Sequence, residues 1–418
     1  MHQILIDGSW VAPETGVAAD VLNPATLKAI ASVVDCDAVD IARAVAAAVT
    51  AQPAWQARPR SERVAALSDL AAELRARAFA IAALLTQETG KPLVEACDCV
   101  EWAAENLSAA AKTSIGADAG PVVAVLPTVD FPLLSCARLA VGALAGGRSV
   151  VIRAPATHPL AILEFSKILA KLPAGTVNVV TGGAHAAAAL LGRSGVSDGQ
   201  AFLTLWGRRD AGRLALDPIL VCGDADLDVA AAGVAWARLV NGGQTIAASR
   251  TVLVETSVSR DFADRLHSYV AFLEAGNPSK SETDLGPLLS HEAVRDLEAR
   301  VARSTKDGAV LKLGGRAYKP WGLSGHFFQP TVLSQVLPGN SAVRDPMRGP
   351  VIALTPVADV AAAVEFLTQR NALEGLVLYA GPSAGAVQAA LPSSCDVDHV
   401  TSRRQSWYPY AGRARAGG

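Results

Sequence analysis

Residues 120–182 read GPVVAVLPTVDFPLLSCARLAVGALAGGRSVVIRAPATHPLAILEFSKILAKLPAGTVNVVTG. Short runs rich in valine and isoleucine alternate here with longer apolar stretches. The runs are residues 122–126, 149–152 and 176–180, and the stretches are residues 132–145 and 159–172. Such alternation is typical of βαβ units around a parallel sheet. It predicts a Rossmann-like α/β domain, although the dinucleotide fingerprint G-x-G-x-x-G is absent.

The sequence also predicts secondary structure on both sides of this stretch. Residues 1–34 resemble an extended arm, and a helix is expected over residues 61–88, with Ser61 as N-cap and Gly90 after its end. After Pro218 a second α/β unit is expected. It comprises a strand at 219–222, a helix at 227–240, a strand at 251–255, a helix at 260–273, a loop region rich in glycine and proline, and a strand-helix pair over 351–369.

Composition narrows the class of protein. The chain has 418 residues, 51% of them apolar, which favours two or three domains with sizeable cores. A net charge of −2 gives no basic field for nucleic acid. No apolar run approaches the length of a membrane helix, and the N-terminus lacks the pattern of a signal peptide. Six cysteines form no disulfide framework, which indicates a cytoplasmic setting.

Short motifs follow one another in an order that resembles the aldehyde dehydrogenase superfamily over nearly the whole chain. They are Asn23-Pro-Ala-Thr26, Gln87-Glu-Thr-Gly-Lys-Pro92, residues 172–182, Asp224-Ala-Asp-Leu-Asp228, Asp284-Leu-Gly-Pro287, residues 325–331, Arg348-Gly-Pro-Val351 and Glu374-Gly-Leu376. The resemblance implies an aldehyde dehydrogenase-like α/β fold. Its expected parts are a Rossmann-like NAD(P)-binding-type domain at 1–217, a catalytic-type α/β domain at 218–397, and a C-terminal return segment and disordered tail at 398–418.

The resemblance also bears on assembly. Family members dimerise through a bridging sheet built from a hairpin after the N-terminal helices and a strand near the C-terminus. Only residues 107–119 separate the helices from the next strand, and the chain ends near the family's last glycine-rich segment. We therefore expect the bridging sheet to be reduced or absent and a family-style tetramer not to form, with a protein partner or an active homologue as an alternative assembly.

The segment Asn241-Gly-Gly-Gln-Thr-Ile246, which continues to Arg250, resembles the family's G-Q-x-C-x-x-x-x-R loop. Gln244 matches the loop, but the position of the catalytic thiol holds Ile246, which has no nucleophile. The oxyanion-binding asparagine corresponds to Asp130, and an ionised carboxylate accepts hydrogen bonds without donating them. A solvated or capping role is favoured for Asp130. The segment that carries the family's general-base glutamate is missing before Pro218.

The cofactor groove is altered as well. The family's ribose-binding lysine corresponds to Arg153, and its phosphate turn corresponds to residues 205–208, with Gly207 and Arg208 as candidate cofactor-binding residues. These arginines either form an anion site for a phosphate or are solvated. The resemblance implies NAD or NADP as cofactor. No metal site is expected, because Asp224, Asp226 and Asp228 lack the rest of a calcium loop and suit helix capping better.

Two interpretations follow. In the first, the chain is a pseudoenzyme that keeps the fold but lacks nucleophile, base and oxyanion donor, and acts as a structural, regulatory or binding subunit. In the second, it is an NAD(P)-dependent oxidoreductase of the aldehyde dehydrogenase family, or a binder of a nucleotide or phosphate ligand, with altered chemistry. The sequence leaves open whether the chain is an enzyme.

Overall fold

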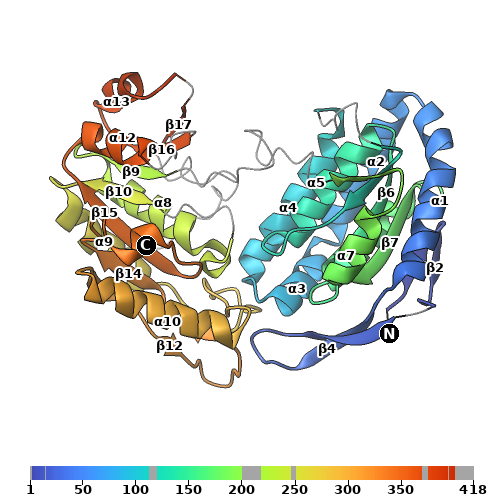
Figure 1. Ribbon diagram of the computed structural model, residues 1–418, viewed down its shortest axis with the longest axis horizontal. Helices are drawn as coiled ribbons and strands as arrows, with labels where there is room; N and C mark the ends of the chain where they lie inside the picture. The colour runs from blue at the N-terminus through green and yellow to red at the C-terminus, as the bar shows by residue number, and fades with distance from the viewer. Residues whose placement is uncertain are drawn as a thin grey trace. The chain divides into compact units, whose positions relative to one another are not determined.

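Residues 2–14, 16–112, 120–199, 218–245, 251–369, 375–393 and 395–400 are described by the computed structural model. The chain divides into two units, Met1–Arg213 and Leu214–Gly418, each with its own sheet and its own core (Figure 1).

The first unit is built on a six-stranded sheet with the order β2-β1-β7-β6-β5-β8. Its strands are β1 (Ile4–Ile6), β2 (Ser9–Val11), β5 (Val122–Val125), β6 (Ser149–Pro155), β7 (Val177–Gly182) and β8 (Val196–Asp198). The strands from β7 to β8 are parallel, while β1 runs antiparallel to β7 and to β2. The sheet order reverses at β5, because β6 lies on one side of β5 and β8 on the other.

Helices cover both faces of this sheet. α1 (Ala38–Ala57) and α7 (Ala184–Leu191) pack on one face through a cluster that includes Ile41, Leu190 and Val151. On the other face, α5 (Pro132–Ala145) contacts β5 and β6, and α6 (Leu160–Leu169) contacts β7. Three further helices pack against α5 and α6: α2 (Arg60–Ala76), α3 (Ala78–Thr89) and α4 (Leu93–Ser108). A separate antiparallel hairpin consists of β3 (Val17–Leu22) and β4 (Ala29–Asp35). A parallel sheet buried on both faces explains why its strands are almost entirely apolar.

The second unit is built on a seven-stranded sheet with the order β11-β14-β15-β10-β9-β16-β17. The strands are β9 (Ile219–Val221), β10 (Val252–Glu255), β11 (Val310–Leu313), β14 (Thr331–Ser334), β15 (Val351–Val357), β16 (Gly375–Tyr379) and β17 (Asp396–His399). All neighbours are parallel except β11, which pairs antiparallel with β14. A small hairpin joins β12 (Ala317–Tyr318) to β13 (Phe327–Phe328).

Three core clusters place the helices on this second sheet. α8 (Leu227–Leu239) and α9 (Ser259–Ala271) pack on one face through residues that include Val234, Phe262 and Ile352. The opposite face is covered by α12 (Val360–Thr368) and α13 (Ala384–Ala390) over β9 and β16, and by α10 (His291–Lys306) and α11 (Ser341–Arg344) over β14 and β15.

The predicted α/β alternation is confirmed, and α5 spans the predicted residues 132–145. Two expectations were wrong. The helix expected over 61–88 is two helices that meet at Arg77, and α2 begins after Pro59 rather than at a Ser61 cap. The loop region expected after residue 273 contains the 16-residue helix α10, capped by Ser290. The predicted capping by the aspartate motif is confirmed, because Asp226 accepts bonds from the N–H groups of Asp228 and Val229.

The expected loss of the bridging sheet concerns residues 113–119 and the segment after residue 400, which lie outside the described residues. Among the helices that the structure describes, none is long and apolar enough to cross a membrane.

Candidate functional site

Asp130 lies in the turn that leads from β5 into α5. Its side chain is buried, with 8% of the residue exposed, and its Oδ1 accepts a hydrogen bond from the N–H of Phe131 at 3.1 Å. Pro132 occupies the first position of α5, where a proline is well tolerated. Asp130 therefore accepts a bond from the residue before α5 but does not cap the helix, because Phe131 is the N-cap of α5 and no side chain caps it. Asp130 is also buried rather than solvated.

A buried lysine lies beside this turn. The side chain of Lys91 is fully buried, and its Nζ is 3.6 Å from a carboxylate oxygen of Glu95 and 4.5 Å from the centre of the Phe131 ring. A cation over an aromatic face gains electrostatic stabilisation, and more so away from water. Sequence reasoning quoted Lys91 only as part of a motif and missed this role, because Lys91 and Phe131 are far apart in the chain.

Arg153 lies near the carboxyl end of β6. Its Nη1 donates to the Gly182 carbonyl of the neighbouring strand at 3.3 Å, while its Nε is buried and has no hydrogen-bond partner among the described residues. Burial lowers the pKa of Arg153, and the charge of Asp35 partly offsets this effect. Arg153 is thus half buried, and its Nε is a buried donor without a hydrogen-bond partner among the described residues.

His158 follows in the turn between β6 and α6. The imidazole is buried, its Nδ1 lies 2.8 Å from the hydroxyl of Thr157, and its Nε2 has no partner among the described residues. Burial lowers the pKa of His158 to about 4, with a further contribution from the charge of Arg153. The ring is therefore neutral near pH 7. Sequence reasoning assigned His158 no role beyond the entry to a helix.

Glu88, from α3, holds the start of α6 in place. Its two carboxyl oxygens accept the N–H groups of Leu160 at 2.5 Å and Ala161 at 3.0 Å. Burial raises the pKa of Glu88 to about 8, and the two backbone bonds oppose this shift. Because α6 starts directly after the turn of His158, Glu88 also fixes the position of that turn.

In the second unit, the loop that contains Gln244 begins with a tight turn after α8. Gly243 has a φ of +67°, and a Cβ at this position would lie 2.0 Å from the carbonyl oxygen of Gly349. The backbones meet directly, with the N–H of Gly349 donating to the Gly243 carbonyl at 2.9 Å. Arg238, also buried, donates to the carbonyl of Val351 from Nε and Nη2. Only glycine fits this close approach.

Gln244 joins that turn to residues 287–289. Its Nε2 donates to the carbonyls of Asn241 and Pro287 at 3.2 and 3.4 Å, and its Oε1 accepts the N–H of Leu289 at 3.0 Å. Gln244 thus has a structural role as well as the position that the motif assigned. Ile246, Gly207, Arg208 and Arg250 lie outside the described residues.

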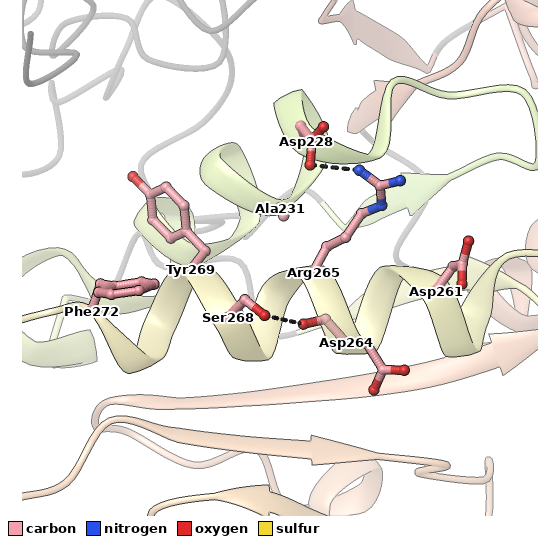
Figure 2. A pocket seen from close by; sticks show the side chains of 8 residues that line it. All are labelled: Asp228, Ala231, Asp261, Asp264, Arg265, Ser268, Tyr269 and Phe272. Atoms are coloured by element: carbon pink, nitrogen blue, oxygen red, sulfur yellow. Dashed lines mark hydrogen bonds and ion pairs between the residues drawn. The ribbon is translucent and has the colours of Figure 1, made fainter. Parts of the chain in front are cut away.

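A separate cavity of about 490 Å³ opens between α8 and α9 (Figure 2). Its walls include the ion pair of Arg265 and Asp228, 2.7 Å apart, and the exposed ring of Phe272. None of the sequence-predicted site residues lines it. The described residues also contain no group of three or more side chains arranged to hold a metal ion.

Known proteins resemble this chain along most of its length. The model of the aldehyde dehydrogenase family matches residues 10–214 and 215–377. The chain is 32% identical over 414 residues to the succinate-semialdehyde dehydrogenase [NADP(+)] GabD of Escherichia coli strain K12, covering 90% of this chain and 84% of that protein. It is 29% identical over 388 residues to the lactaldehyde dehydrogenase of the same strain, covering 84% and 80%.

Solved structures are also similar to this chain over most of its length. The crystal structure of lactaldehyde dehydrogenase from Escherichia coli superimposes with a TM-score of 0.82 at 26% identity, covering 95% of this chain and 90% of that one. The structure of 3,6-anhydro-L-galactose dehydrogenase superimposes with a TM-score of 0.81 at 25% identity, covering 95% and 91%.

These matches overturn one expectation. We expected a family-style tetramer not to form, but the chain aligns over 95% of its length with aldehyde dehydrogenases, and enzymes of this kind typically form oligomers. The expectation was wrong because it rested on the lengths of two segments, and residues 113–119 of the first segment and the whole of the second lie outside the described residues. The match of the family model and the identity to GabD over nine-tenths of the chain establish that this protein belongs to the aldehyde dehydrogenase family.

Proposed function

We propose that this chain is an NAD(P)-dependent oxidoreductase of the aldehyde dehydrogenase family that acts on the carbonyl group with altered chemistry. The observation that carries the proposal is the unused buried donor of Arg153 at the carboxyl end of β6. In open parallel sheets, ligands bind at the carboxyl ends of the strands, near the point where the strand order reverses. Here that point is β5, the neighbour of β6.

The residues of the first unit fit a nucleotide. The Nε of Arg153 and the Nε2 of neutral His158 are both buried without a hydrogen-bond partner among the described residues, so each would gain a bond from a phosphate or hydroxyl oxygen that reached it. Gly207 and Arg208 are proposed to complete the site, and residues 1–217 to form the nucleotide-binding domain, with 218–397 as the catalytic-type domain and 398–418 as the C-terminal segment. NAD(P), when bound, supplies the acceptor or donor for hydride.

The altered chemistry follows from the side chains that replace the family's thiol and amide. Ile246 offers no nucleophile, and the buried cysteines of the described region are poor substitutes. Burial raises the pKa of Cys99 to about 12, and it raises the pKa of Cys136 further. A thiol with so high a pKa is protonated near pH 7 and unreactive. Asp130 accepts a bond where the family has a donor. We therefore propose that neither Cys99 nor Cys136 forms a thiohemiacetal with the substrate.

A second candidate function is supported by the same residues. Ile246 and Asp130 together favour a protein that binds the nucleotide but does not turn over aldehydes. The cytoplasmic setting stays a prediction under both proposals.

The deciding experiment measures nucleotide binding first and turnover second. Calorimetry with NAD, NADP, CoA and ATP is run on the wild type, on Arg153→Ala and Arg153→Lys, and on Arg260→Ala as an exposed control. We expect NAD or NADP to bind, Arg153→Ala to weaken the Kd about tenfold or more, and Arg153→Lys to recover part of it. The absence of binding by both NAD and NADP contradicts the proposal.

Turnover is then followed as formation of reduced nicotinamide with succinate semialdehyde and lactaldehyde, against a boiled control. Aldehyde-dependent reduction above that control supports the oxidoreductase. Binding with no reduction for these or other aldehydes favours the second candidate.

A further inference from the structure

Two histidines from distant parts of the chain meet on the surface of the second unit. The ring centroids of His291 and His326 are 5.7 Å apart, and the ring planes are inclined by 56°. His291 is exposed, and His326 is partly exposed, so both imidazoles are accessible to an ion from solvent.

The backbone holds this pair in place from both sides. His291 is the first residue of α10, directly after the N-cap Ser290, whose side chain accepts the N–H of Ala293. His326 lies opposite Leu288 in an isolated antiparallel bridge, and its carbonyl accepts the N–H of Leu288 at 2.7 Å. The segment 288–291 therefore supplies one histidine and fixes the position of the other. The backbones that carry the two histidines are therefore held close together by hydrogen bonds of the fold.

The separation fits coordination of one ion by both rings. With metal–nitrogen bonds of about 2.0–2.1 Å, two imidazoles on one tetrahedral or trigonal ion place their ring centroids roughly 5–6 Å apart. The observed 5.7 Å lies inside this range. Ring stacking by itself would not require that both rings be accessible to solvent, whereas binding of an ion does. Histidine is also the commonest nitrogen ligand of zinc and its neighbours in the transition series.

We propose that His291 and His326 form a surface site for a divalent transition-metal ion of the zinc class, with water at the remaining positions. The described residues offer no third His, Cys, Asp or Glu for such an ion, so the site keeps open positions. The site is distinct from the nucleotide-binding region proposed above and does not depend on it.

Binding at this site acts on the loop of Gln244. Gln244 bonds the carbonyl of Pro287 and the N–H of Leu289, which flank the residue paired with His326. An ion that joins His291 to His326 closes a ring through residues 288–291 and restricts the segment on which Gln244 rests. The ion would therefore restrain residues 287–289, to which Gln244 is hydrogen-bonded.

The test uses the untagged full chain, stripped with EDTA and kept reduced, and titrated with Zn²⁺ by calorimetry. We expect one ion per chain for the wild type, and an affinity at least about tenfold weaker for His291→Ala and for His326→Ala. His185→Ala, which removes an exposed histidine of α7 in the first unit, is the matched control and should bind as the wild type does. Equal binding by all four proteins overturns the proposal, as does the absence of a one-to-one site.

Two further measurements guard against a variant that merely misfolds. His291→Cys should retain binding, and its Co²⁺ complex should gain a thiolate-to-metal absorption band that the wild-type complex lacks. Hydrogen exchange of residues 286–292 should slow when Zn²⁺ is added to the wild type and stay unchanged in His326→Ala. A Co²⁺ band already present in the wild type, or exchange that slows equally in His326→Ala, places the ion elsewhere and contradicts the site.

Discussion

The turn regions of the two units are stabilised in opposite ways. Around β5 and β6, the first unit buries ionisable groups: Glu88, Lys91, Asp130, Arg153 and His158. Around the turn after α8, the second unit relies on close backbone contact from Gly243 to Gly349 and on the neutral side chain of Gln244, beside the buried guanidinium of Arg238. The first arrangement is sensitive to charge and pH, and the second to added volume. Substitutions in each region therefore test whether the two turn regions differ in this way.

The largest effect is expected at the glycine contact. Gly243→Ala puts a Cβ 2.0 Å from the Gly349 carbonyl oxygen at a φ of +67°. We expect a loss of about 3 kcal/mol or more in the free energy of unfolding, because backbone must move to relieve the clash. Gly308→Ala is the matched control, since Gly308 has a φ of +100° but a Cβ added there would meet nothing within 4 Å. Urea denaturation of both variants measures the difference; equal losses would show that the backbone angle alone is responsible.

The second effect tests the buried charges through pH. The pKa of Glu88 is raised from 4.5 to about 8 in the folded protein. The folded state therefore holds a proton that the unfolded chain has released. Its contribution to stability is fully present below pH 4.5 and is lost as the pH rises towards about 8, with a slope of up to about 1.4 kcal/mol per pH unit.

Glu88→Gln removes this titration and one acceptor at the start of α6, for a loss of about 1–2 kcal/mol near pH 5. The stability advantage of the wild type over the variant should shrink between pH 5 and pH 8. Glu62→Gln, at an exposed position in α2, serves as the control. Denaturation curves of the wild type and both variants across this pH range measure that difference in stability. An advantage that grows with pH would mean that Glu88 is ionised in the folded protein.

A smaller effect is expected for the neutral bonds of the second unit. Gln244→Ala removes three hydrogen bonds to backbone groups and should cost about 1–2 kcal/mol, with little dependence on pH. Gln369→Ala, which removes one exposed contact with Glu365, should be close to neutral. Thermal unfolding of the two variants measures the difference. If Gln369→Ala lost as much stability as Gln244→Ala, the hydrogen bonds of Gln244 would not stabilise the loop more than an exposed contact does.

The smallest effect is expected at the cavity between α8 and α9. Arg265 and Asp228 form an exposed ion pair there, visible in Figure 2. Arg265→Ala should leave the free energy of unfolding close to that of the wild type, because exposed pairs are screened by water and salt. A denaturation midpoint that shifts more than that of Gln369→Ala would show that this surface is under greater constraint than its exposure indicates.

Local pattern predicted the architecture well where strands and helices were strongly apolar, as in residues 120–182. It failed where no residue type marks a boundary: α2 and α3 meet at Arg77 without glycine or proline. It also missed α10, although Ser290 and the buried residues Val294, Leu297 and Val301 carry the cap and the spacing of an amphipathic helix. The glycines and prolines that flank α10 led us to predict a loop at this position.

The site residues also fall into two groups, those that the sequence pattern identified and those that it missed. Motif order alone assigned positions to Asp130, Arg153 and Gln244, because those assignments depend on neighbours in sequence. The contact of Lys91 with Phe131, the cap that Glu88 forms on α6, and the meeting of His291 with His326 depend on how distant segments pack. No local pattern encodes such contacts, so only the folded structure identifies them.

The bonds of Arg238 also fix an order of events during folding. Its donors reach the carbonyl of Val351, 113 residues further along the chain. Until β15 has docked beside β10, the guanidinium and the Gly243–Gly349 contact lack their partners. We therefore expect the loop of Gln244 to gain protection from solvent only after β15 has paired with β10, since its contacts close a long stretch of chain. A nascent chain that has not yet added β15 has the helix of Arg238 but no finished turn at residues 241–243.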